Sequence, residues 1–143
     1  MKMPPAEKIL EAYSAIADKR IIMHENSAEV SSSDGTKTYT VEWDGNTYAS
    51  SDPATYWQGY PGYPVLAVLM KQGKLPLDEE AVASMAHIPW KKLNDAHKRD
   101  YAAAAEEALG NVENKEEIMR LAQEGNALLA EMDLVLKRKL KKK

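Results

Sequence analysis

Residues 27–50, which read SAEVSSSDGTKTYTVEWDGNTYAS, decide the fold because two turn signals divide them into three strand-like segments. The signals are the pairs Asp34-Gly35 and Asp44-Gly45, and Asp-Gly tolerates the positive φ angles of a tight hairpin. The stretch therefore predicts a three-stranded antiparallel meander.

The two turns also predict which side chains share a face of the sheet. With the first Asp-Gly pair as the loop, Val30 faces Tyr39 and Ala28 faces Val41; with the second, Val41 faces Tyr48. The apolar face then consists of Ala28, Val30, Tyr39, Val41, Trp43 and Tyr48. Threonines and Glu42 take the opposite face, so we expect one side of the sheet to be in contact with water.

Helical patterns flank the meander on both sides. The predicted helices span residues 4–19, 64–72, 78–86, 89–110 and 114–136, and residues 21–23 form a further strand candidate. The helix at 64–72 is apolar all round, which is typical of a central element. We therefore predict an α+β fold: an N-terminal helix, a small three- to four-stranded antiparallel meander, then four helices packed on one sheet face.

The chain divides into three predicted parts. Residues 1–110 form an α+β domain with an aromatic loop at 51–63, residues 111–136 form a C-terminal helix, and residues 137–143 form a basic disordered tail. The C-terminal helix carries one apolar stripe: Ile118, Leu121, Gly125, Leu128, Met132 and Val135. This stripe predicts docking on the domain or, alternatively, a homodimer through residues 115–136.

Composition excludes several classes of protein. The 143 residues contain no Cys, which rules out disulfides, thiol nucleophiles and zinc ribbons. Apolar runs are too short for a membrane span and the N-terminus is not a secretory signal, so we expect a cytoplasmic protein without a transmembrane segment. We find no phosphate loop, dinucleotide fingerprint or paired-histidine motif, and expect no cofactor, no metal and no catalytic residue.

Aromatic residues gather in one region of the sequence. Seven of the ten aromatics fall within residues 39–63, and with no Phe anywhere they serve either the core or a binding surface. The candidate ligand or partner-binding residues are Trp43, Asp52, Tyr56, Trp57, Gln58, Tyr60 and Tyr63. No Lys or Arg occurs between Lys37 and Lys71, which argues against nucleic-acid stacking on this region.

Three functions remain open. The leading hypothesis is a non-catalytic binding or interaction protein that uses the aromatic loop, with an unknown protein or small ligand as partner. The alternative is a small-ligand or carbohydrate-binding, enzyme-like pocket at the same loop, using Asp52, Gln58 and His24. The third is weak nucleic-acid association through the tail, because the formal charge of −3 divides into −9 over residues 1–136 and +6 over 137–143. The anion-binding residues of that tail would be Lys137, Arg138, Lys139, Lys141, Lys142 and Lys143.

Overall fold

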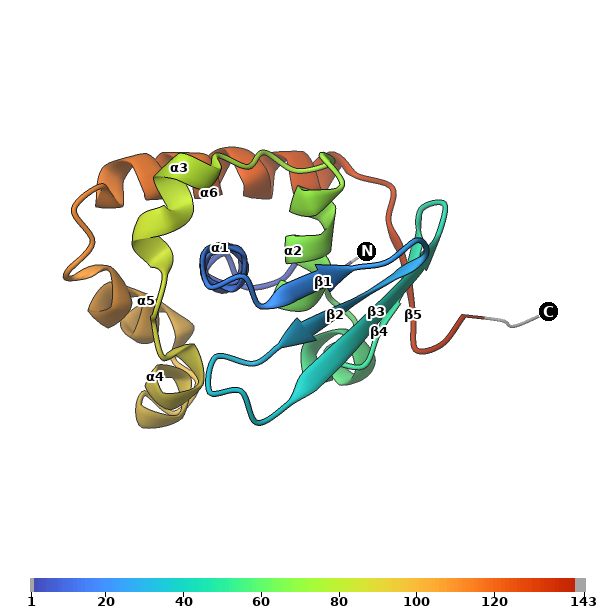
Figure 1. Cartoon of the computed structure of the whole chain (residues 1–143), viewed down its shortest axis with the longest axis horizontal. Coiled ribbons are helices and arrows are strands. Elements are labelled where there is room, and N and C mark those ends of the chain that lie inside the picture. The colour runs from blue at the N-terminus through green and yellow to red at the C-terminus, as the bar shows by residue number, and fades with distance from the viewer. Residues whose placement is uncertain (1, 141–143) are drawn as a thin grey trace.

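A computed structural model describes residues 2–140 and shows a mixed α+β fold with a five-stranded sheet (Figure 1). The strands lie side by side in chain order: β1 (Ile21–Met23), β2 (Ser27–Ser31), β3 (Thr38–Asp44), β4 (Thr47–Ser50) and β5 (Val135–Lys137). The first four are antiparallel neighbours, as the meander predicts, whereas β5 pairs in parallel with β4.

The predicted register holds across the first hairpin and moves at the second. Ala28 pairs with Val41 and Val30 with Tyr39, as expected. Tyr48, however, pairs with Trp43 rather than Val41. The second loop is Gly45-Asn46, because Gly45 has a φ of +60° and occupies the first loop position, where a type II′ turn requires glycine. The correction moves the pairing by two positions, so the predicted apolar face keeps the same members.

The helices differ in length. They are α1 (Lys8–Ala17), the π-helical turn η1 (Ala54–Gln58), α2 (Tyr63–Lys71), α3 (Glu79–Val82), the 3₁₀ turn η2 (Ala83–Met85), α4 (Trp90–Ala96), α5 (Tyr101–Leu109) and α6 (Lys115–Glu131). Among them, α2 and η1 make the main contacts to the sheet. Figure 1 shows α1 and α2 side by side next to the sheet, with α6 crossing above both. Every residue of α2 from Pro64 to Met70 is buried, which places this helix at the centre of the core.

The single helix predicted over residues 89–110 is wrong. The chain breaks at Lys98 and Arg99, whose φ angles of +52° and +66° are incompatible with a helix. Asp100 then accepts a hydrogen bond from the backbone N–H of Ala103 at 3.1 Å and begins α5 as its N-cap. The break turns Tyr101 and Arg99 toward a cavity described below.

The C-terminal segment also differs from its prediction. Helix α6 ends at Glu131 rather than near residue 136, and the chain then runs along β4 as β5. Gly125 faces α1 so closely that a Cβ there would lie 2.5 Å from Cδ1 of Ile9. Helix α6 is therefore packed on its own chain, while a homodimer through residues 115–136 stays a prediction.

No helix within residues 2–140 has the length and apolar character needed to cross a membrane.

Candidate functional site

The aromatic loop is organised by the carboxylate of Asp52, which is buried. Oδ1 accepts hydrogen bonds from the hydroxyls of Ser50 and Thr55, and Oδ2 accepts one from the backbone N–H of Thr55 at 3.0 Å. Thr55 in turn accepts from the N–H of Gly62 at 3.0 Å, which joins the two ends of the loop. Gly62 is required here, because a Cβ would lie 2.0 Å from Oδ2 of Asp52. Asp52 is therefore a structural residue of the loop.

Burial divides the loop into an exposed tip and an anchored end. Trp57 is 67% exposed, whereas Tyr60 is only 9% exposed and Tyr63 is partly buried. Tyr56 packs edge-to-face on Trp57 with ring centroids 4.7 Å apart. The anchored end of the loop therefore belongs to the core, whereas the exposed tip is accessible from solvent.

The C-terminal segment holds the exposed tip. Arg138 places its guanidinium 5.2 Å from the ring centroids of both Tyr56 and Trp57, and its Nε donates to the carbonyl of Tyr56 at 3.2 Å. Lys137 lies in β5. In the structure Lys137 therefore pairs with β4 as part of β5 and Arg138 contacts the aromatic loop, whereas the prediction placed both residues in a disordered tail. Lys139 is exposed, and Lys141, Lys142 and Lys143 lie outside the described residues.

A cavity of about 560 Å³ opens behind the exposed tip. Its walls come from α1, the β2–β3 loop, the aromatic loop, α4 and the start of α5. The aromatic side chains in the lining are Tyr39, Trp57, Tyr60, Tyr63, Trp90 and Tyr101. A hollow of this size, lined by rings with polar tips, suits a small organic molecule.

A buried ion pair lies in the wall of the cavity. Nζ of Lys8 is 3.1 Å from Oε2 of Glu11, and the two side chains are only 11% and 7% exposed. The ammonium of Lys8 also lies 4.0 Å from the ring centroid of Tyr101. Asn94 donates from Nδ2 to Oε1 of Glu11 at 3.2 Å. Burial raises the pKa of Glu11 above its usual value, and the neighbouring Lys8 opposes that rise.

Burial in the cavity wall also shifts the pKa values of neighbouring side chains. Burial raises the pKa of Tyr63, and it raises the pKa of Tyr60, where Tyr101 adds to the effect. For Lys8, burial acts against the ammonium, but the attraction and hydrogen bond of Glu11 outweigh it and raise the pKa. The cavity wall is thus a low-dielectric environment in which a charged ligand group would interact strongly.

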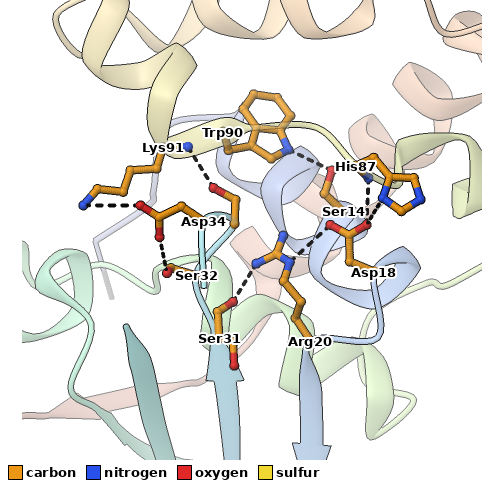
Figure 2. Close-up of polar contacts among 10 residues, drawn as sticks. Ser14, Asp18, Arg20, Ser31, Ser32, Asp34, His87, Trp90 and Lys91 are labelled. Atoms are coloured by element: carbon orange, nitrogen blue, oxygen red, sulfur yellow. Dashed lines mark hydrogen bonds and ion pairs between the residues drawn. The ribbon is translucent and has the colours of Figure 1, made fainter. Parts of the chain in front are cut away.

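Polar contacts join α4 to the β2–β3 loop and to α1 (Figure 2). The backbone N–H of Lys91 donates to Oγ of Ser33 at 3.0 Å, and Nζ of Lys91 lies 4.0 Å from Asp34 in the same β2–β3 loop. Nη1 of Arg20 donates to the carbonyl of Ser31 at 2.6 Å. These contacts join the first turn of α4 and the end of α1 to one hairpin.

A second set of contacts joins the segment before α4 to α1. The backbone N–H of His87 donates to Oδ1 of Asp18 at 2.7 Å, and Asp18 also accepts from Nε of Arg20 at 3.2 Å (Figure 2). The indole of Trp90 donates from Nε1 to Oγ of the buried Ser14 at 2.8 Å. These contacts tie α1, the β2–β3 loop and α4 together beside the cavity.

The charge of the site differs from the expectation drawn from its local sequence. Five cations line the cavity: Lys8, Arg20, Lys37, Lys91 and Arg99. Three carboxylates accompany them: Glu11, Asp52 and Asp95. The absence of Lys and Arg between Lys37 and Lys71 therefore does not predict the charge of the cavity lining. Folding brings cations from α1, the β2–β3 loop and the α4–α5 region to the aromatic loop.

The fold brings most of the predicted site residues together. Asp52, Trp57, Gln58, Tyr60 and Tyr63 all line the cavity. Trp43 does not; it packs on Tyr48 with ring centroids 6.3 Å apart. Tyr56 stands behind Trp57 rather than in the lining.

His24 does not join Asp52 and Gln58. Its Nε2 lies 3.1 Å from Oε2 of Glu29, in an exposed pair beside β1 and β2. Within the described part of the chain, no group of three His, Cys, Asp or Glu side chains is close enough to hold a metal ion.

Sequence reasoning missed the cavity residues outside the loop. Lys8 and Glu11 belong to a helix that carries Ala12, Ser14 and Ala15 where a solvated face would carry charges. That excess of small residues was a signal that α1 is enclosed on every side. No comparable local signal marks Asn94, because it enters the site through the packing of α4.

A second, more apolar cavity of about 780 Å³ lies between α1, α5 and α6, with Leu10, Leu109 and Met119 in its lining. Met119 is 44% exposed.

Comparison with known proteins adds a family but no activity. The family model described as "Uncharacterised conserved protein UCP014422" matches residues 1–136, which include the aromatic loop and every residue of the cavity lining. The chain belongs to this family. No curated protein and no solved structure matches the chain.

Proposed function

We propose that the chain is a non-catalytic binding protein whose ligand site is the cavity beside the aromatic loop. The observation that carries the proposal is the position of Trp57, which is 67% exposed at this cavity and yet held by Tyr56 and Arg138. A large apolar ring fixed in contact with water is typical of a binding surface.

A small ligand fits this site better than a flat protein surface. The cavity is a hollow of about 560 Å³, and Tyr60 and Tyr101 line it together with Trp57. The buried carboxylates support binding rather than catalysis, because Asp52 is occupied by loop hydrogen bonds and Glu11 by Lys8. Location in the cytoplasm, self-association and weak nucleic-acid binding by the tail stay predictions.

The three indole N–H groups allow a direct test. Trp57 and Trp90 line the cavity, whereas Trp43 does not, so Trp43 is an internal control in a ¹H–¹⁵N spectrum. Titration with a panel of monosaccharides, sugar phosphates and nucleosides should move the Trp57 signal and leave that of Trp43 in place.

A matched pair of variants completes the test. Trp57→Ala should abolish ligand binding as measured by calorimetry and by the indole signal of Trp90, which also lines the cavity, and Met119→Ala, an exposed apolar residue of the other cavity, should leave binding unchanged. Both variants should fold, since both side chains are exposed. A titration that survives Trp57→Ala, or a panel that moves no indole signal, would contradict the proposed function.

A further inference from the structure

We infer that the ligand of this cavity is an acidic carbohydrate, a hydroxylated ring that carries a phosphate or carboxylate group. This inference rests on the proposed function and adds the chemical class of the ligand. It combines three observations: cations available for an oxyanion, one buried acceptor without a donor, and aromatic walls of suitable size.

The first observation is a local reversal of charge. The chain carries a net charge of −3, but five cations face three carboxylates in the cavity lining. Two of these carboxylates are already engaged, Glu11 by Lys8 and Asp52 by Ser50 and Thr55. Asp95 remains as the one lining carboxylate with no hydrogen bond or ion pair among the described side chains.

The cations of the lining also differ in whether a carboxylate pairs with them. Lys8 and Arg20 have carboxylate partners at 3.1 and 3.2 Å. Within residues 2–140, no ion pair engages Lys37 or Arg99, and Lys91 is 4.0 Å from Asp34. Two cations without an ion pair in this part of the chain, Lys37 and Arg99, thus line one hollow together with Lys91, whose contact with Asp34 is long. This arrangement suits an oxyanion with several acceptor atoms.

The second observation concerns Asn94. Its Oδ1 is buried and accepts no hydrogen bond from any described residue, although a buried amide oxygen normally has a donor. The orientation of the amide is determined by Glu11, because Nδ2 donates to that carboxylate and the reverse orientation would oppose two oxygens. Asn94 lines the cavity, so a ligand hydroxyl that reaches this amide would supply the missing donor.

The third observation concerns the aromatic side chains that line the cavity, which offer both apolar ring faces and polar hydroxyl groups. Trp57, Tyr60 and Tyr101 offer ring faces and hydroxyls, to which the C–H faces and hydroxyls of a sugar are complementary. A purely aromatic anion would leave Asn94 without a donor, and inorganic phosphate would leave the rings without a partner. A sugar with an acidic group satisfies all three features.

The test compares four probes with the intact chain at one ionic strength: glucose 6-phosphate, glucuronate, glucose and inorganic phosphate. Calorimetry and the Trp57 indole signal report binding. We expect one acidic sugar to bind at least about tenfold more tightly than glucose and than inorganic phosphate, since one charge-assisted hydrogen bond is worth roughly that factor. The two acidic sugars distinguish a phosphate ester from a carboxylate.

Neighbouring residues supply matched controls for the cations. Lys91→Gln and Arg99→Gln should each weaken binding of the acidic sugar about tenfold. Lys92→Gln and Lys98→Gln change the same net charge outside the cavity lining and should have little effect. Equal losses from all four variants would overturn a site-specific role for the cations.

The remaining outcomes separate this inference from the proposed function. If glucose or a neutral nucleoside binds as tightly as the acidic sugars, the acidic class is wrong and the binding site stands. If inorganic phosphate binds as tightly as glucose 6-phosphate, the ring requirement is wrong. If none of these four probes binds but a nucleoside of the wider panel does, the inference fails and the proposed function stands. If no member of either set binds at the loop, both fail.

Discussion

Arg138 donates a hydrogen bond from Nε to the carbonyl oxygen of Tyr56 at 3.2 Å and so joins the C-terminal segment to the aromatic loop. The same guanidinium lies 5.2 Å from the ring centroids of Tyr56 and Trp57. The last strand of the sheet therefore positions the exposed tip of the candidate site.

Arg138→Ala should release Trp57 without unfolding the protein. The pair is solvent-exposed, so we expect a loss of less than about 1 kcal/mol in the free energy of unfolding. The expected change is a lower ¹⁵N order parameter for the Trp57 indole. Lys139→Ala is the control, and equal order parameters in the two variants would contradict the role of Arg138.

Ser14→Ala should destabilise the protein because it leaves the indole N–H of Trp90 without an acceptor. Both side chains are buried, and an unsatisfied buried donor costs about 1–3 kcal/mol. Denaturant unfolding measures this loss. In a Trp90→Phe background the donor is already absent, so Ser14→Ala should cost much less there. The same cost in both backgrounds would show that the hydrogen bond contributes nothing.

Gly125→Ala should weaken the packing of α6 on α1. The added Cβ would lie 2.5 Å from Cδ1 of Ile9, and Ile9 is 1% exposed, so its side chain has little room to move. Overpacking costs about 1–3 kcal/mol and the better helix propensity of Ala returns about 1, which leaves a net loss of roughly 1 kcal/mol.

Ile9→Val provides the control for Gly125→Ala, since it removes the Cδ1 atom that the new methyl would contact. We expect the double variant to lose less stability than the two single variants together. Strictly additive losses in thermal or denaturant unfolding would contradict a close approach of the two helices.

Asp34 should titrate far below an ordinary carboxyl group. Hydrogen bonds from the hydroxyl and N–H of Thr36, with a third from Ser32, lower the pKa of Asp34 to about 2. Because the pKa is lower in the folded state, its contribution to stability is present above the unfolded value of 3.8 and is lost as the pH falls toward 2.

The titration of Asp34 can be followed through its carboxyl ¹³C signal. Thr36→Val removes the hydroxyl donor and should raise the pKa of Asp34, whereas Thr38→Val, on the same hairpin, should not. An unchanged pKa in Thr36→Val would show that the hydroxyl bond is absent in solution.

The antiparallel meander could be predicted because its signals are local. Alternation and the Asp-Gly turns determine the pairing of Val30 with Tyr39, and a two-position error at the second turn preserves the faces. The break at Lys98 and Arg99 could not be predicted in this way. Neither residue type favours a positive φ, so no local sequence preference marks this break.

The candidate site was predictable only where it lies on one segment. Trp57 and Tyr60 stand out as part of a dense aromatic run, whereas Lys8 reaches the cavity from α1, and Asn94 and Arg99 reach it from the α4–α5 region. The parallel strand β5 could not be predicted either, because the pattern of a three-residue strand is too short to show which sheet edge it joins.

The parallel pairing of β4 with β5 also has a consequence for biosynthesis. Thr47 pairs with Val135, so β4 leaves the ribosome long before its neighbour exists. Until then β4 has a free edge of unpaired backbone groups, which in a nascent chain invites contact with other chains. Chaperone dependence during translation should therefore be greatest in the interval between the synthesis of α2 and that of β5.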